Sequence, residues 1–163
     1  MIYDDFIGTT DHRIQSGASF TYVDITQSAD SLSNNRVEMI PGVFGEYTFT
    51  GPRLTSVVGA RYDQHLLFGG QFSPRVHLKY KVSERTDFRF TSGKGWRVPN
   101  YIIDNISLLA NSFQWVAPLE TKPEVSWNIG SSVYQEFEWF KKKMTLTVDF
   151  YRTWFENQLI IDR

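Results

Sequence analysis

One stretch of the chain, residues 71–83, alternates between apolar and polar side chains without a break. Every even position from Phe72 to Val82 is apolar, and every odd position from Ser73 to Ser83 is polar. A period of two is typical of a β-strand with one apolar face and one polar face. At about 3.3 Å per residue, a strand of this length can cross a bilayer when it is tilted.

The same alternation recurs along the rest of the chain and predicts an all-β protein. We expect seven strands, or eight if residues 2–7 form one, in an antiparallel up-and-down meander with no long helix. Pro41 lacks an N–H and therefore needs a bulge or a sheet edge. The sequence of residues 100–111 is compatible with a short helix. The other predicted strands are 14–26, 36–49, 53–64, 86–92, 123–135 and a last strand from 144 toward 161.

The predicted connections alternate in length, which favours a membrane barrel. Short turns are expected at 50–52, 83–85 and 136–142, and longer loops at 27–35, 65–70 and 93–122. Strands this long exceed the usual five or so residues of globular proteins. Aromatic side chains gather at predicted strand ends, as in the aromatic belts of membrane proteins. A soluble β-sandwich binding module also alternates and stays open as an alternative.

Composition argues against several classes of function. The chain has no cysteine, which excludes disulfides and thiolate metal sites, and its 17 basic residues nearly balance its 18 acidic ones, which gives no general attraction to nucleic acid. The three histidines lack metal-ligand spacing, and no G-x-S-x-G or phosphate-loop pattern occurs. We therefore expect neither an enzyme nor a protein with a cofactor or bound metal.

A lipid-facing Arg or Lys is costly at the middle of a bilayer, by about 2–4 kcal/mol. The charged residues of the predicted strands should therefore face the lumen of a barrel. There they either pair with one another or contact a plug or substrate. The residues expected to face the lumen are Arg61, Asp63, Arg75, His77, Lys79, Arg89, Glu124 and Asp149.

Five short motifs occur in one order and carry a family resemblance. They are G-A-R-Y-D-Q-H at 59–65, F-S-P-R at 72–75, G-K-G-W-R-V-P-N at 93–100 with Arg89 before it, E-V-S-W-N-I-G at 124–130, and D-F-Y-R-T-W-F-E-N-Q-L-I-I-D at 149–162. Together they resemble the TonB-dependent outer-membrane receptors, particularly the vitamin B12 and siderophore receptors of Bacteroidetes.

The resemblance implies a barrel of about 22 strands with a plugged lumen, of which residues 1–163 cover roughly a third. Neither a plug domain nor a TonB box is recognisable, so the chain resembles a middle-to-late fragment of the barrel. Such receptors lie in the outer membrane of Gram-negative bacteria and import a large scarce nutrient such as a corrinoid, metal chelate or glycan. The implied partners are membrane lipid, the remaining barrel and plug, TonB acting through that plug, a surface lipoprotein and the nutrient.

In such receptors the segment around 97–100 belongs to an extracellular loop. Ligand contacts are therefore expected from the outer loops and upper lumen, where Trp and Arg offer stacking faces and paired donors. In the competing interpretation, Trp96 and Trp115 anchor the chain at the membrane interface, and Arg97 stabilises the loop. The candidate ligand-binding residues are His65, Phe68, Trp96, Arg97, Asn100, Asn105 and Trp115.

A self-contained small outer-membrane barrel is the other alternative. It closes if residues 2–7 pair with the last strand, and it suits adhesion or a structural role better than transport.

Overall fold

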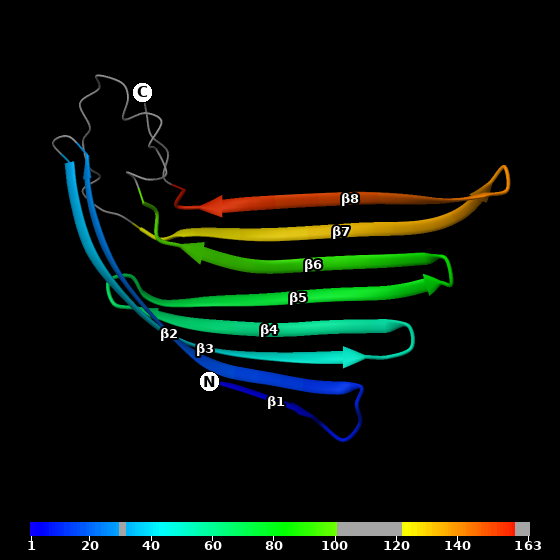
Figure 1. Ribbon diagram of the computed structural model, residues 1–163, viewed down its shortest axis with the longest axis horizontal. Coiled ribbons are helices and arrows are strands. Elements are labelled where there is room, and N and C mark those ends of the chain that lie inside the picture. Colours follow the sequence, from blue (N-terminus) through cyan, green and yellow to red (C-terminus); the bar gives the residue numbers. More distant parts are fainter. Residues whose placement is uncertain (30–31, 101–121, 159–163) are drawn as a thin grey trace.

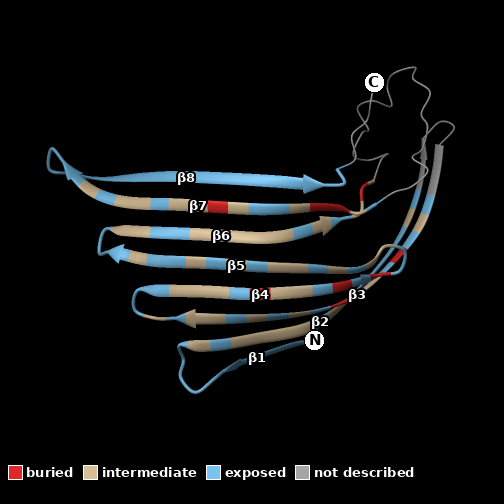
Figure 2. Ribbon diagram, turned by 180° about the vertical axis from the view of Figure 1, so that it is seen from behind, coloured by how far each residue is buried: buried red, intermediate tan, exposed pale blue. Residues whose placement is uncertain are grey.

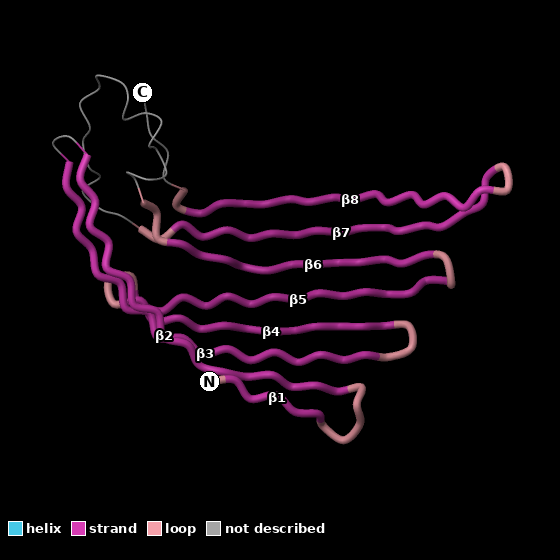
Figure 3. Tube along the Cα trace, in the orientation of Figure 1, coloured by secondary structure: helices cyan, strands magenta, loops and turns pink. Residues whose placement is uncertain are grey.

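The computed structural model describes residues 1–29, 32–100 and 122–158, which form one antiparallel sheet in which every strand pairs with its neighbours in the chain (Figure 1). Within these residues no helix is long and apolar enough to cross a membrane, and Figure 3 shows strands joined by loops. The strands are β1 (Ile2–Phe6), β2 (His12–Ala29), β3 (Leu32–Thr50), β4 (Leu54–His65), β5 (Gly69–Ser83), β6 (Thr86–Arg97), β7 (Glu124–Trp139) and β8 (Lys142–Glu156).

The predicted all-β meander is confirmed, and it has eight strands in the order β1 to β8. Two alternatives do not fit the residues that the structure describes. A sandwich needs two packed sheets, whereas the described residues make a single sheet. A closed eight-stranded barrel needs β1 to pair with β8, but in the described residues these strands lie at opposite edges (Figure 1).

The strand registers divide the side chains between two faces. Arg61 pairs with Ser73, Arg75 with Gly93, and Arg89 with Ser132, which places these positions on one side, here called the polar face. The opposite side, here called the apolar face, carries most of the large hydrophobic residues of the strands. Its members include Phe20, Val43, Val58, Tyr62, Phe72, Val76, Leu78, Phe88, Val133, Leu146, Val148 and Phe150.

The apolar face is not covered by any other part of the described chain. Val125 and Pro99 are the buried apolar side chains among these residues, whereas Phe20 is 66% exposed and Phe150 59% exposed. Both edge strands are exposed along their whole length, as the pale blue β8 in Figure 2 shows. A water-soluble protein rarely leaves so much contiguous apolar surface open, so this face needs a partner such as lipid.

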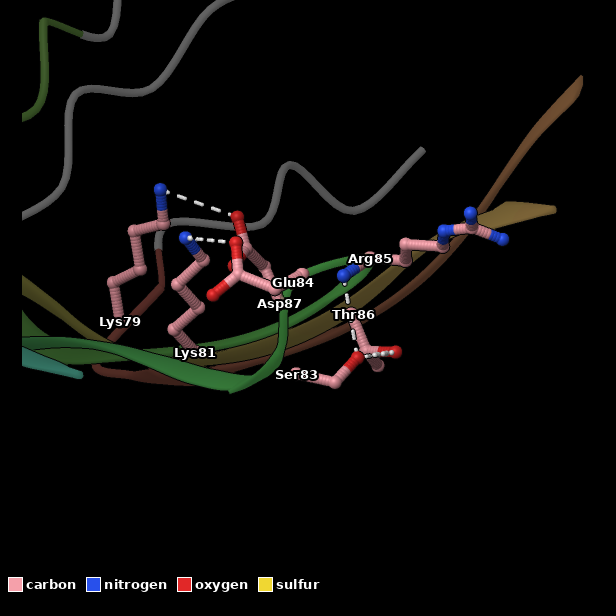
Figure 4. Close-up of polar contacts among 7 residues, drawn as sticks. All are labelled: Lys79, Lys81, Ser83, Glu84, Arg85, Thr86 and Asp87. Carbon is pink, nitrogen blue, oxygen red and sulfur yellow. Dashed lines mark hydrogen bonds and ion pairs between the residues drawn. The ribbon is translucent and has the colours of Figure 1, made fainter. Parts of the chain in front are cut away.

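The ends of the sheet differ in construction. The turn end carries the connections at 7–11, 51–53, 84–85 and 140–141, and the rim end those at 30–31, 66–68 and 98–123. Figure 4 shows one connection of the turn end. There Lys79 lies 3.2 Å from Asp87, Lys81 lies 3.3 Å from Glu84, and the Ser83 hydroxyl accepts from the Arg85 N–H.

The predicted polar loop at 27–35 is wrong, because β2 and β3 continue through it. Their pairing runs to Ala29 and Leu32, while the β3–β4 pairing begins only at Gly42. The two strands therefore project beyond the sheet as a ribbon at the rim end (Figure 1). Backbone pairing alone maintains a strand, so a polar sequence does not end it. Pro41 pairs with β2 where β3 has no second neighbour, which agrees with the expected edge position.

The predicted loop at 65–70 is also shorter than expected. Only 66–68 separate β4 from β5, and Gly69 takes the left-handed φ of 73° that such a tight connection needs. β6 continues to Arg97, past the start at 93 that was predicted for an irregular segment. Residues 136–139 belong to β7, and its turn consists of Phe140 and Lys141. The difference in loop length between the two ends is therefore smaller than the sequence indicates.

Candidate functional site

The candidate site lies at the rim end, where the sheet divides. The pairing of β5 with β6 stops at Arg75 and Gly93. Beyond that point, the start of β5 pairs only with β4, and the end of β6 pairs only with β7. Side chains from β4 and β6 meet here, although β5 lies between these strands lower in the sheet. The rim cluster comprises Arg61, Asp63, His65, Phe68 and Trp96.

Asp63 is the centre of the rim cluster. Its side chain is 6% exposed, and the guanidinium of Arg61 donates from Nε to Asp63 Oδ2 at 2.8 Å. The indole N–H of Trp96 adds a long hydrogen bond of 3.4 Å to the same oxygen. Arg61 also donates to the Ser19 hydroxyl on β2 at 2.8 Å. One buried carboxylate thus joins β4 to β6, and its guanidinium partner reaches β2.

His65 follows Asp63 by two residues on β4 and is fully buried. The backbone N–H groups of Leu67 and Phe68 donate to His65 Nδ1 at 3.1 and 3.3 Å. The proton of a neutral ring is therefore on Nε2, which has no hydrogen-bond partner in the described part of the chain. The Phe68 and Trp96 rings lie 4.8 and 6.1 Å from the His65 ring. A buried donor without a partner is costly and suits a site that a ligand completes.

Two further ion pairs lie at the same end. Arg36 and Glu38 on β3 are 2.7 Å apart with side chains only 12% and 11% exposed, and both act electrostatically on His65. Arg97 on β6 donates from Nε to Glu124 on β7 at 2.6 Å. Figure 2 shows that buried residues collect toward the rim end. Most of the buried side chains that the structure describes at the rim end are polar or charged.

The structure brings several of the sequence-predicted ligand residues together. His65, Phe68 and Trp96 share the rim cluster, and Arg97 follows Trp96 at the end of β6. Asn100 lies just beyond β6 and has a partner within the molecule. Asn105 and Trp115 lie outside the described residues, as does the helix considered for 100–111 apart from its first residue.

The residues expected to line a lumen share the polar face. Arg61, Asp63, Arg75, His77, Lys79, Arg89, Glu124 and Asp149 occupy that face by register. Arg75 pairs with Glu46 farther down the wall. Trp96 is different, because it belongs to the apolar face by register yet reaches Asp63 across the divided sheet.

Sequence reasoning did not single out Ser19, Arg36 or Glu38 as site residues. Their only signal was an alternating position on β2 or β3, which they share with many residues outside the site. Arg36 and Glu38 lie on the projecting ribbon, whereas Ser19 pairs with Gly42 at its base, next to Asp63 on β4.

The described residues of the rim cluster offer groups suited to binding a polar molecule. No group of three or more His, Cys, Asp or Glu residues that could hold a metal occurs among the described residues. The rim cluster instead combines aromatic faces, a guanidinium and carboxylates, which suits recognition of a large polar molecule.

The model of the TonB dependent receptor-like β-barrel family matches residues 2–163. The chain belongs to this family. No curated protein matches the chain. TonB-dependent receptors are transporters and receptors rather than enzymes, which confirms the expected absence of enzymatic function. The family also accounts for the sheet, because the wall of an outer-membrane barrel is a meander with one polar and one apolar face.

Proposed function

We propose that this TonB-dependent receptor chain forms part of the wall and outer rim of an importer for a large, scarce nutrient in the outer membrane of a Gram-negative bacterium. The observation that carries the proposal is the rim cluster, where Asp63 and His65 are buried among aromatic rings without a surrounding apolar core. The polar face would line the lumen, and the rim end would face outward.

The nutrient class follows from the chemistry of the rim. Trp96 and Phe68 offer stacking surfaces, and the part-exposed guanidiniums of Arg61 and Arg97 can hold carboxylates or phosphates in pairs. A corrinoid, a metal chelate or a glycan presents both kinds of group. The resemblance of the sequence motifs to those of vitamin B12 and siderophore receptors of Bacteroidetes favours the first two, and Asn100, Asn105 and Trp115 would add contacts beyond the cluster.

The open edges support a larger assembly. β1 and β8 are both exposed and do not pair with each other within the described residues, so each can pair with another strand. The remaining barrel strands and a plug would supply these partners. TonB would act through that plug, and a surface lipoprotein would be a further partner at the rim. A small closed barrel has no comparable support.

The binding proposal is tested in cells that carry the whole receptor. We expect Trp96→Leu and His65→Gln to weaken binding and uptake of the cognate ligand at least tenfold, measured against cobalamin, ferric siderophores and oligosaccharides. Trp139→Leu at the turn end is the matched control, because this tryptophan is 59% exposed and far along the chain from the rim cluster. Equal uptake by all variants with unchanged receptor levels would contradict the proposal.

The larger assembly has separate tests. The DNA on both sides of this coding sequence should encode a plug upstream and further strands downstream, in frame. The chain expressed alone should need detergent and should form strand-paired oligomers, because its two edges remain open. A monodisperse monomer in plain buffer would contradict this part of the proposal.

A further inference from the structure

Two cationic side chains lie on the apolar face, where contact with lipid makes a charge unfavourable. Lys94 pairs with Trp127, and Arg152 pairs with Ile129, which places both on the apolar face. Among the strand residues that the structure describes, the one other lysine or arginine of that face is Lys142, the first residue of β8 beside its turn. At the middle of a bilayer each cation would cost about 2–4 kcal/mol, but near an interface only about 0–1 kcal/mol.

The position of the two cations along their strands explains how they can be tolerated on this face. Counted along β7 from Trp139, the turn-end partner of Lys142, Lys94 lies twelve residues away at the level of Trp127, and Arg152 lies ten residues away at the level of Ile129. A tilted strand needs about 9–11 residues to cross the hydrocarbon layer. Both cations therefore lie close to the bilayer interface at the rim end, the level at which lipid headgroups begin.

The neighbours of the two cations are those of an interfacial site. Trp127 on β7 pairs with Lys94 on one side and Trp154 on the other, and the guanidinium of Arg152 stacks 4.7 Å from the Trp154 ring centroid. Tryptophan is enriched at the headgroup level. Neither cation has an acidic ion-pair partner in the described residues, and Glu156 lies two residues nearer the strand end than Trp154.

A groove on the same face leads to this group. It has a volume of about 580 Å³, and most of its lining residues belong to the apolar face. Small residues on four successive strands, Gly45, Ala60, Pro74 and Ser92, leave space between larger neighbours, and Trp127 lies at one end. An acyl chain fits an apolar groove of this kind, because it is flexible and buries apolar area.

We infer that Lys94, Trp127, Arg152 and Trp154 form a binding site for the phosphate groups of an outer-leaflet lipid, with an acyl chain in the adjoining groove. Two strand spacings and two residues separate the cations, or about 12 Å between their Cα atoms. That spacing allows two phosphates of one headgroup to be held at once. The inference rests on the proposed orientation with the rim end outward, but not on the identity of the imported nutrient.

The test uses the purified whole receptor in detergent, titrated with bisphosphorylated lipid A and followed by native mass spectrometry. We expect bound lipid on the unmodified receptor and at least tenfold weaker binding for the Lys94→Gln/Arg152→Gln double variant. The matched control, Arg89→Gln/Lys143→Gln, removes two cations from the polar face of the same two strands and should bind like the unmodified receptor.

A second arm needs no variant and therefore does not depend on folding of a mutant. Lipid A stripped of its phosphates should bind the unmodified receptor at least tenfold more weakly, and millimolar inorganic phosphate should not displace the intact lipid. Equal binding of the two lipids, equal binding by the double variant, or displacement by inorganic phosphate would each overturn the inference. Nutrient uptake, measured in parallel, reports on the proposed function separately.

Discussion

The rim end and the turn end of the sheet both carry ion pairs, but the pairs differ in burial. At the rim end, the Asp63 and Glu124 side chains are 6% and 7% exposed beside their arginines. At the turn end, Glu84 is 92% exposed beside Lys81 (Figure 4). Ion pairs of the same kind therefore lie in a water-poor environment at the rim end and in a water-exposed one at the turn end.

The difference separates a binding region from a structural one. An exposed pair gains little, because water screens it, whereas a buried carboxylate needs its partners to offset its lost hydration. Retaining such carboxylates at the rim adds little stability over an apolar substitute. Their presence there agrees with a proposed role in recognition, while the turn end only has to connect neighbouring strands.

The largest effect is expected from Asp63→Ala at the rim end. This change removes the acceptor for both Arg61 and Trp96. We expect the free energy of unfolding to fall by about 2 kcal/mol, the effect of a lost hydrogen bond to a charged group, because the 39% exposed Arg61 recovers some hydration. Guanidinium unfolding of the whole receptor in detergent, followed by tryptophan fluorescence, measures it.

The control for this change is Asp87→Ala at the turn end, which removes the partner of Lys79. It should lower the unfolding free energy by less than half as much. If the two substitutions proved equally costly, the contrast in burial between the ends would have no energetic meaning.

A smaller loss is expected when Gly42 on β3 becomes alanine. The new Cβ would lie 2.1 Å from Asp63 Oδ1 and 2.8 Å from Arg61 Nη2, so this pair has to move. Overpacking of this kind costs about 1–2 kcal/mol. Gly45→Ala is the matched control three residues along the same strand, because no atom lies within 4 Å of its added Cβ. Thermal unfolding should lower the midpoint for Gly42→Ala alone.

Much of this sheet could be predicted from the sequence, because alternation is a local property. In an alternating segment, the residue types at positions such as Phe72 and Arg75 indicate which face of the sheet each side chain occupies. The fold class follows from the repetition of that pattern along the chain. Strand ends were predicted less well. Residues 27–35 are polar enough for a loop, yet the backbone of β2 and β3 stays paired there.

The rim cluster could be predicted only in part. His65, Phe68 and Trp96 are candidates by residue type and by position near strand ends. The contact between Trp96 and Asp63 joins residues 33 positions apart and depends on where β5 separates from β6. No periodic pattern encodes that separation. Arg36 and Glu38 were not identified for the same reason, since the ribbon that positions them was expected to be a loop.

At the turn end, one substitution should stabilise the protein. Phe140 and Lys141 have φ values of 49° and 58°, which is the left-handed region that ordinary side chains disfavour. A two-residue hairpin turn with both φ values positive prefers Asn-Gly. The Phe140→Asn/Lys141→Gly double variant should therefore raise the free energy of unfolding by about 1 kcal/mol. Guanidinium unfolding checks this, and a destabilised variant would show that the Phe140 ring contributes more than its 87% exposure suggests.

The smallest effect is expected for Glu84→Ala in the β5–β6 turn. Glu84 contacts Lys81 at 3.3 Å, but the almost complete exposure of its side chain leaves the pair screened by water and salt. The unfolding free energy should change by about 0.5 kcal/mol or less, and the change should disappear in 1 M salt. Ser83→Ala in the same turn removes a hydrogen bond to Thr86 and the acceptor for the Arg85 N–H, so it should cost more than Glu84→Ala. The reverse order would mean that charge, rather than local hydrogen bonding, holds the turn end together.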